Sequence, residues 1–284
     1  MPSDPRSATL PVALVTGSSS GIGLSACALL AEAGFRVVAT MRDPKRSDAL
    51  LARVPGVEIR QLDVQDDASV EVCLADVAEA HGRLDVVLCN AGAGYLGACE
   101  DTPIEDAQRV LDLNFFGVWR VTQAALPVLR RQGHGRLIAV SSVGGLIGQP
   151  FNDAYCAAKF AVEGFYESLA PVARRLGVHV SIVEPGPVNT EFVASVSRDV
   201  AGRHEPVSEP YRAMMAAYRE ATTAAFARAG QSPDEVARVI VEVARAETPH
   251  FRYVTSELVR SVVATKYVDP TGDAVVKLSG SRLP

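Results

Sequence analysis

Short apolar runs rich in β-branched residues alternate along this chain with stretches of helical periodicity. The apolar runs lie at 11–16, 35–40, 57–64, 84–90, 135–142, 178–185 and near 251–255. The helical stretches lie at 21–33, 44–53, 66–81, 104–131, 155–176 and 232–246. Because the runs are apolar almost without interruption, they are typical of parallel strands that are covered on both faces. The alternation predicts a doubly wound α/β fold, with a parallel sheet of about seven strands and helices on both faces.

Segment 190–230 interrupts this alternation, since it carries helical stretches but no strand. An insertion after the sixth strand lies over the carboxyl ends of the strands, where open α/β sheets bind their ligands. We therefore expect a helical substrate lid at 190–230, although an insertion that only packs on the rest of the domain, with no role in binding, would give the same pattern. No repeat, low-complexity tract or linker divides the chain, so the sequence predicts one Rossmann-type domain over 1–284, with a flexible tail at 1–10.

Composition argues against several classes of function. Lys and Arg total 28 against 33 for Asp and Glu, and the resulting net charge of −5 gives no field that would attract a nucleic acid. No apolar stretch is long enough for a membrane span, and residues 1–10 lack the apolar run of a signal peptide. The five histidines show no metal-ligand spacing, so we expect no metal site. The five cysteines are odd in number and form no CxxC pair, which predicts reduced thiols and a cytoplasmic location.

A glycine-rich segment, Thr16 to Gly23, follows the first predicted strand and opens the first predicted helix. This context indicates a phosphate-binding turn. Gly17 would permit the tight turn, Gly21 would let the backbone approach a pyrophosphate, and Gly23 would let helix and strand pack closely. The pattern by itself is also compatible with a plain strand-to-helix turn.

The end of the second predicted strand bears on the choice between the two nicotinamide cofactors. An acidic side chain there would bind the adenosine ribose and repel a 2′-phosphate. The sequence has Arg42 in this region instead, and the Ser19 and Ser20 hydroxyls lie in the glycine turn. A guanidinium with hydroxyl support suits a phosphate, so we expect NADP(H) in preference to NAD(H). The alternative is that Arg42 is an ordinary solvated residue.

Tyr155 and Lys159 are four residues apart and therefore share one face of a helix. A phenol is a poor proton donor and acceptor near neutral pH, and a neighbouring cation is expected to lower its pKa. Ser141 and Ser142 end the fifth predicted strand, and Asn114 lies within a long apolar helical stretch. Each of these residues alone has an ordinary structural explanation, as a surface pair, a turn cap or a bridge between helices.

Taken together, these motifs resemble the short-chain dehydrogenase/reductase family over nearly the whole chain. Thr16–Gly23 matches the family's TGxxxGxG turn, and Asn90-Ala91-Gly92 matches its NAG motif. Further matches are the catalytic tetrad at Asn114, Ser142, Tyr155 and Lys159, the PG pair at Pro185-Gly186, and the adenine-contacting pair at Asp63-Val64.

The resemblance implies hydride transfer between a nicotinamide and a substrate carbonyl, with Tyr155 as general acid and base. Ser142 would bind the carbonyl oxygen, Lys159 would hold the nicotinamide ribose, and Asn114 would anchor a water that resupplies protons. The implied cofactor-binding residues are Gly17, Ser19, Ser20, Gly21, Ile22, Gly23, Arg42, Asp63, Val64, Asn90, Ala91, Gly92, Tyr155, Lys159, Pro185, Gly186, Val188 and Thr190.

Within the family, the run from Ser142 to Tyr155 is similar to the 17β-hydroxysteroid dehydrogenase type 1 and photoreceptor retinol dehydrogenase branch. This similarity implies an apolar, steroid- or retinoid-like alcohol or ketone. Candidate substrate residues are Gln149, Asn152, Met214, Tyr218 and Phe226, with Met215 beside them, although core packing would explain the lid residues equally well. The chain has no histidine between His204 and His250, where the estrogen-active member of the branch uses one, so estrogen specificity is doubtful.

Two other functions are compatible with the sequence. A 3-oxoacyl or polyketide-type ketoreductase uses the same catalytic residues, but often has a basic patch for a carrier protein, and none is evident here. A non-catalytic NADP(H)-binding sensor would have no chemical need for all four tetrad residues. The resemblance also implies a small-molecule partner and a homodimer or homotetramer formed through helices 104–131 and 155–176.

Overall fold

The fold was analysed in a computed structural model, which describes residues 10–191, 207–268, 271 and 273–281. Within these residues the strands form one seven-stranded parallel sheet with the order β3-β2-β1-β4-β5-β6-β7. The strands are β1 Val12–Thr16, β2 Arg36–Met41, β3 Glu58–Gln61, β4 Val86–Cys89, β5 Gly135–Val140, β6 Val178–Glu184 and β7 Arg252–Val254. The order reverses between β1 and β4, so the predicted doubly wound fold is confirmed.

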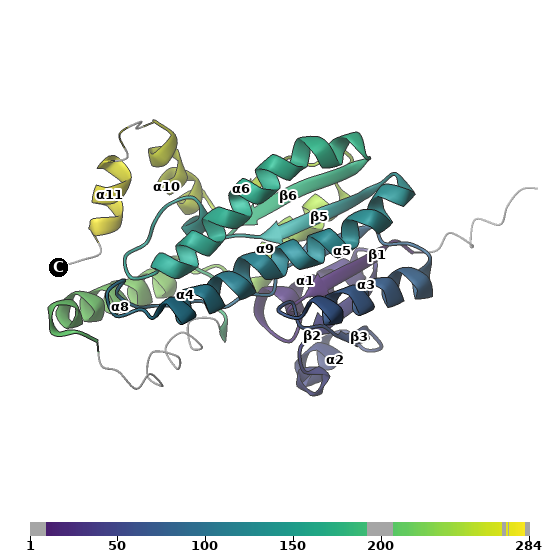
Figure 1. Cartoon of the computed structure of the whole chain (residues 1–284), viewed down its shortest axis with the longest axis horizontal. Helices are drawn as coiled ribbons and strands as arrows, with labels where there is room; N and C mark the ends of the chain where they lie inside the picture. Colours follow the sequence, from purple (N-terminus) through teal and green to yellow (C-terminus); the bar gives the residue numbers. More distant parts are fainter. Residues whose placement is uncertain (1–9, 192–206, 269–270, 272, 282–284) are drawn as a thin grey trace, which may run out of the picture.

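Helices cover both faces of the sheet (Figure 1). One face packs against α3 Asp67–His81, α5 Gly117–Gln132 and α6 Asp153–Arg175. The other packs against α1 Gly21–Glu32, α2 Asp48–Arg53 and α9 Pro233–Arg245. The remaining helices are α4 Ile104–Leu111, α8 Glu209–Ala229, α10 Glu257–Val268 and α11 Asp273–Gly280, and Figure 1 shows α8, α10 and α11 at the same end of the molecule.

The central strand β1 explains why the predicted strands read as unbroken apolar runs. Val12 and Leu14 pack into the core on the α3, α5 and α6 side, whereas Ala13 and Val15 pack into the core on the α1 and α9 side. Successive side chains of a strand point to opposite faces, so a strand covered on both faces needs an apolar residue at every position. The five residues of β1 are all buried.

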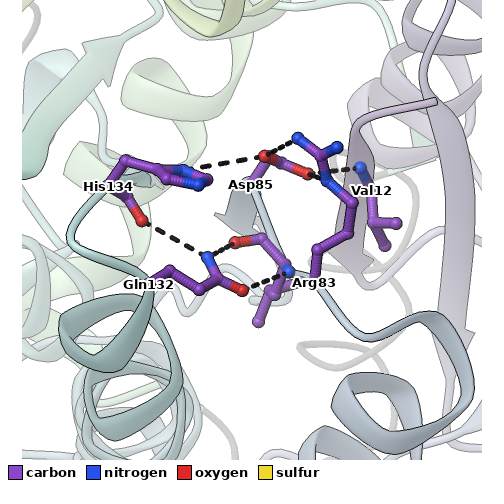
Figure 2. Close-up of polar contacts among 6 residues, drawn as sticks. Val12, Arg83, Asp85, Gln132 and His134 are labelled. Carbon is purple, nitrogen blue, oxygen red and sulfur yellow. Dashed lines mark hydrogen bonds and ion pairs between the residues drawn. The ribbon is translucent and has the colours of Figure 1, made fainter. Parts of the chain in front are cut away.

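Polar bonds close the amino ends of the central strands (Figure 2). The Asp85 carboxylate accepts a hydrogen bond from Val12 N at 2.7 Å and forms an ion pair with Arg83 at 2.7 Å. The Gln132 side chain accepts from Leu84 N at 2.8 Å and donates to the Leu84 carbonyl oxygen at 2.7 Å. This edge is occupied by interactions among its own groups, so the opposite, carboxyl edge is the one left for a ligand.

Several elements differ from the sequence-based prediction. The helix expected at 104–131 contains a π-helical segment at Asp112–Phe116 between α4 and α5, and within it the Asn114 side chain donates to the carbonyl oxygens of Ala93, outside the helix, and of Val110, one turn earlier. The helix expected at 44–53 is a 3-10 turn at Pro44–Arg46 followed by α2. Helices α10 and α11 were not anticipated. Residues 1–9 and 192–206 lie outside the described part, so the predicted tail and the first part of the predicted lid lie almost wholly there, while α8 forms the second part of that segment.

The described helices include none that is both long and apolar enough to cross a bilayer.

Candidate active site

A cavity of about 910 Å³ lies at the carboxyl ends of the strands. Its wall is built by the segments that follow β1, β2, β3, β4, β5 and β6, by the π-helical segment, by two side chains of α6, and by one face of α8. These segments include most of the residues that the sequence singled out: Gly17, Ser19, Ser20, Gly21, Ile22, Arg42, Val64, Asn90, Ala91, Gly92, Asn114, Ser142, Gln149, Asn152, Tyr155, Lys159, Pro185, Gly186, Val188, Thr190, Tyr218 and Phe226.

The turn after β1 needs glycine at the predicted positions. Gly17 and Gly21 have φ values of +68° and +55°, in a backbone region that residues other than glycine rarely adopt. A Cβ atom on Gly17 would lie 2.8 Å from Ala91 Cα, and one on Gly23 would lie 2.2 Å from the Gly17 carbonyl oxygen. Gly23 does not line the cavity but permits the close packing of α1 on the turn.

The first turn of α1 is open to an anion. Ser20 is the N-cap of this twelve-residue helix, but no side chain caps it, and the first turn contains no acidic residue. The first backbone N–H groups of a helix have no partner within it, and the helix dipole favours negative charge there. The turn therefore fits a phosphate group, as the sequence predicts.

The turns after β1 and β4 are bonded to each other. Asn90 Nδ2 donates to the carbonyl oxygens of Thr16 and Gly17 at 3.0 and 3.1 Å. Thr16 Oγ1 accepts hydrogen bonds from the backbone N–H groups of Asn90 and Ala91 at 2.9 and 3.1 Å. These four bonds fix the shape of the cavity floor.

One end of the cavity is basic and lies beyond β2. Arg42 lines it, and its side chain makes no ion pair or hydrogen bond with the described residues. Arg46, which the sequence analysis did not select, lines the same end, because Asp43 caps the 3-10 turn by accepting a hydrogen bond from Lys45 N at 3.1 Å. Asp63 does not line the cavity and instead accepts a hydrogen bond from Gln65 N at 3.0 Å.

The predicted tetrad gathers on the wall formed by β5, α6 and the π-helical segment. Ser142 Oγ accepts from Gly144 N at 3.0 Å, and Lys159 Nζ donates to the Val140 carbonyl oxygen at 3.0 Å. Lys159 Nζ lies 5.8 Å from the centre of the Tyr155 ring. Asn114 Nδ2 donates to the carbonyl oxygens of Ala93 and Val110 at 2.9 and 3.0 Å, so it is held in place by the backbone.

Burial has opposite effects on the two titratable tetrad members. Burial raises the pKa of Tyr155 to about 12, although the Ser142 hydroxyl opposes this shift. Burial lowers the pKa of Lys159 to about 8, although the Glu163 charge opposes this shift. The lower Tyr155 pKa expected from the Lys159 charge is therefore not found, because removal of the phenol from water is the larger effect.

The residues expected to contact substrate fall into two groups. Gln149, Asn152, Tyr218 and Phe226 line the cavity, and Asn152 Nδ2 donates to the Tyr218 hydroxyl at 3.0 Å. Met215 is buried in a cluster with Leu96, Ala98, Phe151 and Tyr218, and Met214 packs on the same cluster. Neither methionine lines the cavity. Other lining residues that the sequence analysis missed are Leu96, Val143, Pro187, Glu191, Arg219, Thr222, Thr223 and Ala225. The helical spacing of α8 gave a signal for Thr222, which lies one turn from both Tyr218 and Phe226. Leu96 lies in a loop without a pattern.

The sequence is similar to those of known proteins over most of its length. The short chain dehydrogenase family model matches residues 11–201. The chain is 42% identical over 278 residues to 17-beta-hydroxysteroid dehydrogenase type 1 of Homo sapiens, which covers 93% of this chain and 83% of that protein. It is 38% identical over 279 residues to retinol dehydrogenase 8 of Bos taurus, with 94% and 88% of the two chains covered.

Solved structures show the same fold. A short-chain dehydrogenase from Streptomyces avermitilis matches with a TM-score of 0.79 and 28% identity, covering 97% of this chain and 98% of that one. An actinorhodin polyketide ketoreductase with NADPH matches with a TM-score of 0.73 and 31% identity, covering 86% and 95%.

We expect Gly17→Ala to weaken binding of a nicotinamide dinucleotide at least about tenfold, measured by quenching of protein fluorescence on titration. The added methyl group meets Ala91, and the positive φ costs a further 1 kcal/mol or more, roughly, which corresponds to most of a tenfold change. Gly34→Ala is the matched control, since Gly34 has a φ of +90° with no atom within 4 Å of its Cβ position. Equal loss of binding in both variants would contradict the assignment of the turn.

Proposed function

The chain belongs to the short-chain dehydrogenase family, and from this premise we propose that it is an NADP(H)-dependent oxidoreductase. It interconverts a ketone or aldehyde and the corresponding alcohol on an apolar, steroid- or retinoid-like substrate. The main support is that Ser142, Tyr155 and Lys159 line the same cavity as the glycine turn after β1. A carbonyl group placed against Ser142 and Tyr155 therefore has room for a dinucleotide beside it.

The cavity fits a nicotinamide dinucleotide along its whole length. The uncapped first turn of α1 would hold the pyrophosphate, and the Pro185–Thr190 segment would hold the carboxamide. Lys159 and Tyr155 would hold the nicotinamide ribose, with Asn90 and Gly92 on the floor beneath it. Bound there, the nicotinamide supplies a hydride to the substrate in reduction and accepts one in oxidation.

Tyr155 and Ser142 carry the acid–base part of the proposed reaction. In reduction, Tyr155 donates its phenolic proton to the carbonyl oxygen while the carbonyl carbon receives the hydride. Ser142 donates a hydrogen bond to the same oxygen, where negative charge develops, and the Gly144 N–H fixes the Ser142 hydroxyl. A Tyr155 pKa of about 12 keeps the phenol protonated at neutral pH, which suits a proton donor.

Asn114 and Lys159 support return of the proton. A Cβ atom on Gly92 would lie 2.6 Å from Asn114 Oδ1 and 3.7 Å from Lys159 Nζ, so the two side chains meet beside Gly92. The glycine leaves space between them. We assign this space to a water that is held by Asn114 and passes protons from the solvent to Lys159 and on to Tyr155.

The preference for NADP(H) rests on the basic end of the cavity. Arg42 and Arg46 both line it, whereas the acid that would bind the ribose of NAD(H) is absent from the end of β2. Asp43 follows Arg42, but its carboxylate accepts the Lys45 N–H. Two guanidinium groups in one turn, beside a carboxylate that is bonded to Lys45 N, suit a 2′-phosphate.

We expect Arg42→Ala to raise the Kd for NADPH by about 10- to 100-fold, since a hydrogen bond to a charged group contributes roughly 1.5–3 kcal/mol. Binding of NADH, measured in the same titration, should change less than threefold, on the order of 0.6 kcal/mol. Arg36→Ala is the control, because Arg36 lies at the amino end of the same strand, away from the cavity. Equal weakening of both cofactors by Arg42→Ala would contradict the role in selectivity.

The substrate class rests on the relatives and on the apolar part of the wall. Two relatives are named as a hydroxysteroid and a retinol dehydrogenase, and Leu96, Val143 and Phe226 contribute apolar side chains to the cavity wall. The polar groups of Gln149 and Asn152 would orient an oxygen atom on the substrate. The similarity to a polyketide ketoreductase keeps an oxoacyl substrate as the second candidate.

The decisive test is NADPH consumption with 17-ketosteroids, retinal, aryl ketones and an acetoacetyl thioester. We expect turnover with steroids or retinal, and a loss of at least about 100-fold in kcat for Tyr155→Phe, in line with the usual contribution of a general acid. NADPH binding by Tyr155→Phe should be retained. Preference for the thioester would favour the ketoreductase assignment, and binding without turnover of any carbonyl would favour a sensor.

A second copy of the chain is the proposed protein partner. Phe116, Trp119, Phe160 and Val172 are exposed on the π-helical segment, α5 and α6, and Trp119 stacks on Phe165 with ring centres 4.2 Å apart. Apolar surface gathered on neighbouring helices is typical of an interface between subunits. We propose a homodimer, or a tetramer built from it, in the cytoplasm, where the five free thiols would stay reduced.

We expect Trp119→Glu to convert the assembly to monomers, measured by sedimentation velocity, because a charge in an apolar interface is costly. Val72→Glu is the control, since Val72 is also exposed but lies on α3. A wild-type chain that sediments as a monomer would refute the proposed interface.

A further inference from the structure

Three buried charged groups and the partly exposed Arg252 lie together behind the cavity wall. Lys159 and Glu163 are one turn apart on the same face of α6, and their exposed fractions are 5% each. Glu184, at the end of β6, is 1% exposed, and Arg252 of the neighbouring strand β7 reaches both carboxylates. Lys159 lines the cavity, whereas the other three do not.

Arg252 holds this group in a fixed arrangement. Its Nη1 atom forms ion pairs with Glu163 and, at 2.7 Å, with Glu184. Its Nη2 atom pairs at 2.7 Å with Glu167, the next residue along the same face of α6, whose side chain is 67% exposed. The guanidinium thus links α6 to β6, and it holds Glu163 through one carboxylate oxygen, Oε2.

The turn after Ser142 presses directly on Glu163. A Cβ atom on Gly145 would lie 2.6 Å from Ser141 Oγ and 3.1 Å from both Glu163 Cγ and the Lys159 carbonyl oxygen. Ser141 Oγ and Glu163 Oε1 are both buried without a hydrogen bond of regular geometry among the described residues, although the Ser141 hydroxyl is close enough to favour the Glu163 carboxylate. Burial of a carboxylate costs free energy, so its retention beside Lys159 calls for a reason.

The electrostatic environment supplies that reason. Burial lowers the pKa of Lys159 to about 8, and the charges that oppose this shift are those of Glu163 first and Cys89 second. Glu163 in turn faces Arg252 and Lys159, with Glu184, Lys266 and Tyr267 within electrostatic range. Burial raises the pKa of Glu163, and the Ser141 hydroxyl and the charges of Arg252 and Lys159 oppose that shift. Burial and the Glu163 charge raise the pKa of Glu184 to about 7.

We propose that Glu163 is a positioning residue for the reaction: fixed by Arg252, its carboxylate balances the Lys159 ammonium and keeps it charged inside the cavity wall. The proposal rests on the proposed function, because Lys159 assists Tyr155 only if the chain is an oxidoreductase of this kind. Glu163 touches neither substrate nor cofactor and acts through Lys159 alone. Its charge extends to higher pH the range over which Lys159 remains an ammonium.

The first test measures Lys159 directly and needs no turnover. The chain has four lysines, Lys45, Lys159, Lys266 and Lys277, so labelling with [ε-13C]lysine gives few NMR signals, and Lys159→Met assigns the relevant one. We expect Glu163→Gln to lower the Lys159 pKa by roughly 1 unit or more, the usual effect of an opposite charge at close range. Glu167→Gln is the matched control on the same helix and should leave the Lys159 pKa unchanged. An unchanged Lys159 pKa in Glu163→Gln would overturn the proposal.

A second charge-removing variant tests the proposal if Glu163→Gln does not fold. Glu163→Leu also removes the charge, and it does not leave Arg252 unpaired, because Arg252 keeps its ion pairs with Glu184 and Glu167. Glu163→Asp keeps the charge and should keep Lys159 within about half a unit of wild type, on the usual scale of such shifts. A shift in Glu163→Asp as large as in Glu163→Leu would show that packing and not charge matters, and would refute the proposal.

The kinetic test uses the carbonyl substrate identified by NADPH consumption. The ammonium form of Lys159 exists below its pKa, so a lower pKa must move the alkaline limb of the kcat profile to lower pH. We expect this limb to move in Glu163→Gln and to return in Glu163→Asp, with the limb of Glu167→Gln unchanged. A lower kcat at every pH with the limb in place would contradict the proposal. If no carbonyl is reduced, the proposed function fails, while the NMR titration still decides whether Glu163 controls Lys159.

Discussion

Every central strand of this chain is covered by side chains on both faces, and that constraint decides where its chemistry takes place. Strands such as β1 carry apolar residues that alternate between the two cores. Polar groups placed there would lose their hydration without gaining partners. The amino edge is closed by the bonds of Asp85 and Gln132, so the carboxyl edge is where polar side chains gather around open space.

The carboxyl edge works as a site because its loops are bonded to one another. Asn90 and Thr16 tie the turns after β1 and β4, and Asn114 ties the π-helical segment to the loop after β4. Each of these side chains satisfies backbone groups that a regular helix or strand would satisfy by itself. The polar residues of the motifs therefore act first on the backbone, and the cavity takes its shape from them.

Sequence reasoning succeeded where a local pattern carries the physical cause. Continuous apolar runs located the strands, and the glycine pattern located a turn that requires positive φ at Gly17 and Gly21. The pattern could not reveal the π-helical segment, because Asn114 is placed by partners such as Ala93, distant in sequence. The sequence analysis selected Met214 together with Tyr218 as lid residues, yet only Tyr218 reaches the cavity, since the rotation of a helix about its axis is set by packing against other elements. Arg46 and Glu163 likewise gained meaning only from neighbours that the chain brings to them in space.

The motif residues cannot by themselves set the proton balance of the site. Burial makes a phenol harder to ionise and an ammonium easier to neutralise, so enclosing Tyr155 and Lys159 in one wall shifts their pKa values in opposite directions. The direction suits proton donation by Tyr155 but acts against a charged Lys159. Opposing charge has to come from residues outside the motifs, and Glu163, held by Arg252 beside Glu184, lies where that charge is effective. A wall in which the cations face carboxyl groups loses less free energy on burial than one that contains the ammonium alone, because opposite charges compensate each other. The position of Glu163 one helical turn after Lys159 thus follows from the same enclosure that the proposed chemistry requires.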